Sequence, residues 1–154
     1  MRKEKRIALV AHDSRKQELK EWVEYNKSVL KDHILYATGT TGTILQECFL
    51  KENGGHLTNV YRLHSGPLGG DQEIGAMIAN KELDVVIFFC DNLITQGHAQ
   101  DIQALSRLAS LYNIAYANNR TTADMIITSP LFSDPNYEMI VPDCIAKYAN
   151  RFSE

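Results

Sequence analysis

Residues suited to phosphate binding follow one short apolar run of the chain. The run Ile34–Ala37 leads into Thr38-Gly39-Thr40-Thr41-Gly42, and a helical pattern begins there. The first turn of a helix leaves backbone N–H groups without intrahelical partners, and the helix dipole favours an anion. Threonine hydroxyls supply further donors, although a threonine at such a junction also serves as a plain helix cap. The candidate phosphate-binding residues are Thr38, Gly39, Thr40 and Thr41.

Acids and histidines follow the other apolar runs. In Ser65-Gly66-Pro67-Leu68-Gly69-Gly70-Asp71, glycines before an acid allow a substrate to approach the backbone closely; a flexible turn with a capping aspartate is the alternative. His98 and Asp101 would share one side of a turn if their segment is helical. Carboxylates and imidazoles are the usual groups of general acid–base catalysis. Further polar candidates are His12, Asp13, Lys16, Ser65, Gly66 and Asp91.

The apolar pattern predicts the elements that position these groups. Short apolar runs typical of buried parallel strands alternate with segments whose apolar residues recur at helical spacing. Right-handed crossovers then give a three-layer α/β/α sandwich with a mostly parallel, doubly wound sheet of about five strands. The polar candidates all follow strands, so one edge of the sheet collects the chemistry. The expected strands are 6–11, 34–37, 59–63, 83–90 and 114–117.

Composition narrows the class of protein. The 154 residues suit a single domain, 1–154, and the formal net charge of -3 offers no basic field for nucleic acid. No apolar stretch has the ~20 residues needed to cross a bilayer, so we expect a cytoplasmic protein without a membrane partner. The five histidines have no ligand spacing that commits to a metal. Cys48, Cys90 and Cys144 are expected to be buried free thiols.

Taken together, these segments resemble the methylglyoxal synthase family over nearly the whole chain. The order of the threonine loop and the glycine-rich block is specific, whereas either alone is weak. Asn92, Ala99-Gln100 and the region Lys51–Gly55 depart from the family pattern, and the first two alter the loop that presents His98. The matching segments are Ile7–Asp13 with Lys16 and Gln17, Ala37–Gly42, Ser65–Gln72, Phe88–Asp91, His98 with Asp101, Thr122–Asp124 and Pro142-Asp143.

The resemblance implies a lyase that converts dihydroxyacetone phosphate to methylglyoxal and inorganic phosphate through an enediolate, without a cofactor. Asp71 would be the base, and His98 and Asp101 would complete the catalytic group. Asp13 and Asp91 would support the site, and Arg151 would reach an acid across a subunit contact in a homohexamer inhibited by phosphate. The implied substrate-binding residues are His12, Lys16, Thr38, Gly39, Thr40, Thr41, Ser65 and Gly66.

Two other classes of protein share this fold. A non-catalytic phosphate- or effector-sensing domain would keep the threonine loop but has no need of Asp71, His98 and Asp101 together. A flavodoxin-like electron carrier or receiver protein is also doubly wound, and it would show a flavin spectrum or a phosphorylated acid. The presence of all three catalytic candidates favours the enzyme.

Overall fold

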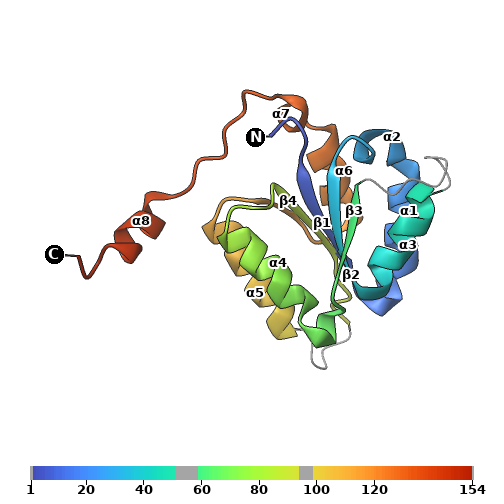
Figure 1. Cartoon of the computed structure of the whole chain (residues 1–154), viewed down its shortest axis with the longest axis horizontal. Coiled ribbons are helices and arrows are strands. Elements are labelled where there is room, and N and C mark those ends of the chain that lie inside the picture. Colours follow the sequence, from blue (N-terminus) through green and yellow to red (C-terminus); the bar gives the residue numbers. More distant parts are fainter. Residues whose placement is uncertain (1, 51–58, 94–98, 154) are drawn as a thin grey trace.

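A five-stranded parallel sheet organises the molecule (Figure 1). The computed structural model describes residues 2–50, 59–93 and 99–153. The sheet has the order β3-β2-β1-β4-β5, and every neighbouring pair is parallel. This confirms the predicted mostly parallel sheet of about five strands. The strands are β1 (Arg6–Ala11), β2 (Ile34–Thr38), β3 (Val60–Leu63), β4 (Val85–Phe89) and β5 (Ala115–Ala117).

Helices cover both faces of the sheet, as the predicted three-layer sandwich requires (Figure 1). One face packs against α1 (Lys16–Tyr25), α3 (Gly39–Leu50) and α6 (Arg120–Thr128), and the other against α4 (Gly70–Ala79) and α5 (Ala99–Leu111). Asn26 lies between α1 and the short helix that follows, and its side chain donates to the Trp22 carbonyl. The short helices are η1 (Asp13–Arg15), α2 (Lys27–Leu30), η2 (Gly66–Leu68), α7 (Pro130–Ser133) and α8 (Asp143–Ala149).

The two central strands are buried on both faces. Every residue of β4 is buried, and five of the six residues of β1 are buried as well. Trp22 of α1 is fully buried, packs edge-to-face on Phe89, and donates its indole N–H to Asp124 of α6 at 2.7 Å. That hydrogen bond satisfies the polar atom of a large core side chain. It also joins α1 to α6 across the same face.

The C-terminal segment leaves the body of the molecule. Residues 134–153 run outward, and α8 stands away from the sheet and its helices (Figure 1). Asn113 donates to the Ile140 carbonyl at 2.9 Å where the segment departs. Tyr148 and Phe152 are 66% and 84% exposed, and no residue of α8 is buried. We call residues 134–153 the C-terminal arm.

The cysteines divide between core and surface. Cys48 and Cys90 are buried, and burial raises the pKa of the Cys90 thiol to about 11. Cys144, in contrast, is exposed because it lies on α8, so the expectation of a third buried thiol was wrong.

Within the described parts of the chain, no helix is both long and apolar enough to cross a membrane.

Buried polar groups close the amino-terminal edge of the sheet. The His33 ring accepts the backbone N–H of Lys5 at 3.2 Å and lies edge-to-face on Phe132. Asp84 accepts the backbone N–H of Arg6 at 2.8 Å. Burial, reinforced by the nearby Lys5 charge, lowers the pKa of His33, because both disfavour the imidazolium. Asp32 and Glu4 oppose this shift to a smaller extent.

Acid should therefore destabilise the protein through His33. Its pKa is lower in the folded state than in the unfolded state, so below roughly pH 6.5 the unfolded chain binds more protons and folding loses stability. His33→Gln keeps a hydrogen-bond acceptor but does not titrate. Between pH 7.5 and 5.5 the free energy of unfolding should therefore fall less in His33→Gln than in the original chain, by up to about 1 kcal/mol. Urea titrations at both pH values measure the difference. Equal pH dependence in the two proteins would contradict this account of His33.

Candidate active site

A cavity of about 290 Å³ lies at the carboxyl ends of the strands. Such a volume lies at the lower limit of ligand pockets, roughly 300–1,000 Å³, so it suits a small metabolite. It adjoins the position between β1 and β4 where the strand order reverses, which is where ligands bind in doubly wound sheets. Its lining includes His12, Asp13, Lys16, Thr38, Gly39, Thr40, Thr41, Ser65, Gly66, Pro67, Asp71 and Phe88.

The junction of β2 and α3 forms one wall of the cavity. α3 begins at Gly39, directly after the last residue of β2, so its first-turn backbone N–H groups lie at the cavity. Gly39 has a φ of 48°, and a Cβ there would lie 2.9 Å from the Ser65 Cβ. A side chain at this position is therefore excluded by conformation and by space. The threonine loop and the Ser65 turn are consequently in contact.

Thr41 contributes a polar atom suited to a ligand. The residue is 3% exposed, and its hydroxyl finds no hydrogen-bond partner among the described residues. An unsatisfied buried hydroxyl costs stability, so such groups call for an explanation. A phosphate oxygen at the start of α3 would accept this hydroxyl.

Lys16 brings a positive charge to the same wall. Its Nζ lies 2.6 Å from the Asp13 carboxylate and donates to the Thr40 hydroxyl. The side chain of Asp13 is 95% exposed, whereas that of Lys16 is 26% exposed. The ammonium is therefore held over the threonine loop by one acid and one hydroxyl. Its remaining donor capacity can serve an anion in the cavity.

A backbone N–H group fixes the orientation of the His12 ring. Its Nδ1 accepts the backbone N–H of Asp91 at 2.8 Å, and its ring packs edge-to-face on Phe88. An accepting Nδ1 requires that a neutral ring carry its proton on Nε2. Nε2–H is then a donor, and His12 lines the cavity. The ring is thus suited to donate to an oxygen of a bound molecule.

Asp71 enters the cavity from the first turn of α4. Gly69, with a φ of 105°, precedes that helix, and a Cβ on Gly70 would lie 2.0 Å from the His64 carbonyl oxygen. The glycine pair therefore allows α4 to start directly against the end of β3. The Asp71 carboxylate oxygen lies 3.3 Å from the position that a Cβ on Gly66 would occupy. Close approach at Gly66 and Gly70 places the Asp71 carboxylate against the cavity wall.

Asp91 links neighbouring residues beside the cavity through hydrogen bonds. Its carboxylate accepts the Ser14 hydroxyl and the Leu93 backbone N–H, the latter at 2.9 Å. Asp91 is absent from the cavity lining, yet its backbone N–H orients His12. Ser14 was not singled out from the sequence, and nothing in its local pattern distinguishes it from a solvated residue. Its partner is 77 positions away, so only the fold reveals the contact.

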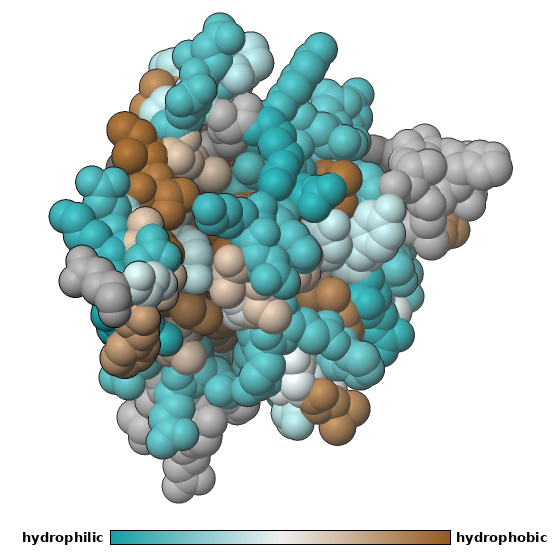
Figure 2. All heavy atoms as spheres, turned by 60° about the vertical axis from the view of Figure 1, so that its left-hand side comes forward, coloured by the Kyte–Doolittle hydropathy of each residue, from teal (hydrophilic) through white to brown (hydrophobic). Residues whose placement is uncertain are grey.

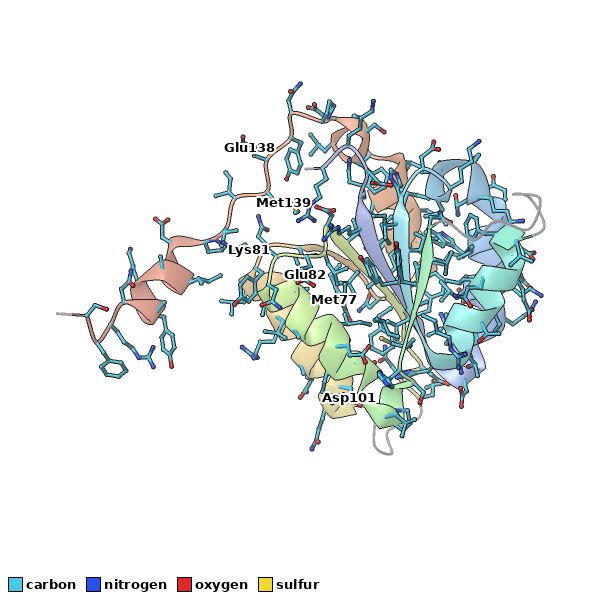
Figure 3. The ribbon with its side chains drawn as sticks, in the orientation of Figure 1. Met77, Lys81, Glu82, Asp101, Glu138 and Met139 are labelled. Carbon is cyan, nitrogen blue, oxygen red and sulfur yellow. The ribbon has the colours of Figure 1, made fainter. Side chains whose placement is uncertain are left out.

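Asp101 and Arg151 do not belong to the cavity lining. Asp101 is partly buried. It lies in the first turn of α5, and this end of the helix is beside the start of α4 (Figure 3). His98, directly before α5, lies outside the described residues, as does the region Lys51–Gly55. Arg151 lies in the C-terminal arm, with its guanidinium 3.5 Å from the Tyr148 ring centroid. Arg151 comes two residues after α8, which stands away from the sheet and its helices (Figure 1).

The arrangement can bind a small phosphate ester and move a proton. Helix N–H groups, hydroxyls and Lys16 provide donors on one side, and the Asp71 carboxylate provides a base on the other. Among the described residues, no group of three or more His, Cys, Asp or Glu side chains has the geometry of a metal site. The chemistry available to the described residues is that of acid–base catalysis with anion binding.

Comparison with known proteins gives one consistent result. Residues 18–118 match the family model described as MGS-like domain. The chain is 47% identical to methylglyoxal synthase of Treponema socranskii over 137 residues, covering 89% of this chain and 85% of that one. It is 52% identical over 129 residues to methylglyoxal synthase of Leptospira interrogans, covering 84% and 82%. The crystal structure of methylglyoxal synthase from Elizabethkingia anophelis superposes with a TM-score of 0.83 at 40% identity, covering 98% of this chain and 93% of that one.

Phosphate should stabilise the folded protein through this cavity. A ligand that binds only the native state adds about 2.7 kcal/mol at a concentration 100 times its Kd. We expect inorganic phosphate to raise the melting temperature, and Lys16→Met to weaken its binding about tenfold or more, since one charge-assisted hydrogen bond is lost. Thermal shifts at constant ionic strength measure both effects.

Lys31→Met is the matched control, because Lys31 is an exposed lysine that does not line the cavity. It should leave the phosphate shift unchanged. The same loss in both variants would mean that phosphate acts through overall charge rather than through Lys16.

Proposed function

The chain belongs to the methylglyoxal synthase family of lyases, and from that premise we propose how its cavity converts dihydroxyacetone phosphate to methylglyoxal and inorganic phosphate. The observation that carries the proposal is that a phosphate-binding wall and a carboxylate line the same cavity. The residues at the junction of β2 and α3 bind the phosphoryl group, with Lys16 as the cationic partner. His12 and the Ser65-Gly66 turn hold the oxygens of the triose.

Asp71 removes the first proton. It abstracts a proton from the carbon that bears the free hydroxyl, and the electron pair forms an enediolate with the adjacent carbonyl carbon. The negative charge then resides on the former carbonyl oxygen, which requires donors in place before the reaction. His12 Nε2–H and backbone N–H groups of the Ser65-Gly66 turn supply donors, and His98 is assigned the same task. Asp101 orients His98 or exchanges protons with it.

Elimination follows from the way the phosphate is held. The terminal hydroxyl then gives up its proton and its C–O bond becomes the aldehyde carbonyl, while the former carbonyl oxygen takes up a proton. The electrons of the enediolate double bond shift to join the former carbonyl carbon to the third carbon, and phosphate leaves from that third carbon. This happens readily only when the breaking C–O bond lies out of the enediolate plane and overlaps its π system. A phosphate fixed by the rigid helix start and its hydroxyls can hold that angle. The enol that remains gains a proton at its methylene carbon and loses one from oxygen, which gives methylglyoxal.

The proposal extends to assembly and location. We assign the chain 1–154 to a single domain that acts in the cytoplasm as a homo-oligomer, with a hexamer as the expected form. The C-terminal arm supports this assignment because it exposes Ile140, Tyr148 and Phe152 away from its own core. The face of the molecule on the side of the arm is largely hydrophilic, with apolar side chains between the polar ones (Figure 2). An arm with exposed apolar side chains gains stability by packing on a second copy.

A direct assay tests the proposed reaction. Purified protein is mixed with dihydroxyacetone phosphate, and methylglyoxal and inorganic phosphate are measured together. Release of both in equal amounts is the expected result. Phosphate release without methylglyoxal would indicate simple hydrolysis, and binding without release would indicate a sensing domain.

Substitution at Asp71 should separate chemistry from binding. Asp71→Asn keeps the size of the side chain but removes its basicity, so we expect kcat to fall by ~10²-fold or more with little change in substrate affinity. Steady-state kinetics and a binding titration measure the two quantities. Near-normal turnover in a folded Asp71→Asn protein would reject Asp71 as the base.

Arg151 should couple subunits rather than bind phosphate. Its guanidinium stacks on Tyr148 and Phe152 in the exposed arm, so in the assembly it can reach an acid of a second copy, for which we propose Asp13. We expect sigmoidal phosphate inhibition, and we expect Arg151→Ala to lower the Hill coefficient more than it weakens inhibition. Inhibition curves with sedimentation of the same samples provide the measurement. Hyperbolic inhibition of a monomeric protein would contradict the assignment.

A further inference from the structure

A side-chain pair links the end of β3 to the first turn of α4, outside the cavity. The Glu73 carboxylate contacts the His64 ring nitrogen Nδ1 and accepts the His64 backbone N–H at 3.3 Å. The side chain of His64 is 69% exposed and that of Glu73 is 33% exposed. Neither residue lines the cavity that contains Asp71. A surface ion pair of this exposure adds little stability, so its value must be sought elsewhere.

The geometry of α4 connects this pair to Asp71. Both acids belong to the first turn of the helix, and residues two positions apart point about 200° around the axis from each other. Asp71 faces the cavity, so Glu73 holds the opposite side of the same turn. Backbone contacts attach the helix start as well: Gly70 N–H donates to the Ser65 carbonyl at 3.0 Å, and Gly70 lies against the His64 carbonyl.

From this arrangement we infer that Glu73, acting with His64, is a positioning residue that fixes the rotation of the first turn of α4 and thereby aims the Asp71 carboxylate. The inference rests on the proposed role of Asp71 as the base. Glycines at positions 69 and 70 contribute no side chains that hold the helix start. Glu73 adds a side-chain contact from the outer side. Because proton transfer depends steeply on geometry, a small rotation reduces turnover while the phosphate-binding wall is unaffected.

The test separates positioning from binding. Glu73→Ala and Glu73→Asp both fail to bridge to His64, and Asp keeps the charge. We expect each to lower kcat about fivefold to tenfold with KM within about twofold. Glu73→Gln retains an oxygen that accepts the His64 backbone N–H, so it should keep at least about half of the turnover. His64→Ala combined with Glu73→Ala should lose less than the product of the single losses.

Controls keep the outcome clear. Glu21→Ala removes a carboxylate from a comparable surface hydrogen bond on α1, to Gln17, and should leave kcat unchanged. Unchanged kcat in Glu73→Asp, or a loss confined to KM, would overturn the inference. Asp71→Asn is measured in parallel: if it is inactive while Glu73→Asp is normal, only the positioning role fails. If Asp71→Asn is fully active, the proposed base itself is wrong.

Discussion

Burial of the central strands on both faces is the constraint on which the rest of the structure depends. β4 is apolar throughout and β1 nearly so, so their backbone groups are satisfied by parallel neighbours. Parallel strands need crossover helices, which return the chain to the same edge each time. Every strand therefore ends at one edge of the sheet. Polar residues are excluded from the buried positions of the two central strands and accumulate where the strands end.

This constraint explains why distant residues meet in one cavity. His12 follows β1, Thr38 ends β2, and Ser65 follows β3, so the two crossovers that join these strands bring them to the cavity. Contacts across the strand ends then refine the positions of the side chains. The Asp91 backbone orients His12, and Thr40 holds Lys16. The central strands provide the rigidity, and these few hydrogen bonds provide the direction of each functional group.

Much of this could be predicted because the determining patterns are local. The alternation of apolar runs and helical spacing gave the sandwich, and the glycine-rich and threonine segments indicated which turns approach a ligand. Strand limits were less certain. The fourth strand was expected to span residues 83–90, yet β4 starts at Val85. The preceding Asp84 is committed to Arg2 and to the Arg6 backbone, which closes the amino-terminal edge.

Other features depend on pairs of residues distant in sequence. Ser14 and Asp91 carry no common signal in the chain, and their contact exists only because β1 and β4 are neighbours. α1 ends at Tyr25, and Asn26 donates both its backbone N–H and its side-chain N–H to the Trp22 carbonyl. The exposure of α8 could not be predicted from the sequence either. An amphipathic pattern shows that a helix has an apolar face, but it does not show whether the same chain or another chain covers that face.

The most direct measurement is a crystal structure of Asp71→Asn with dihydroxyacetone phosphate bound. The expected result has the phosphate at the start of α3, in contact with Lys16 and the Thr41 hydroxyl. The carbon that bears the free hydroxyl should then lie within hydrogen-bonding range of the side chain at position 71. Phosphate bound elsewhere, or a triose chain directed away from position 71, would contradict the account.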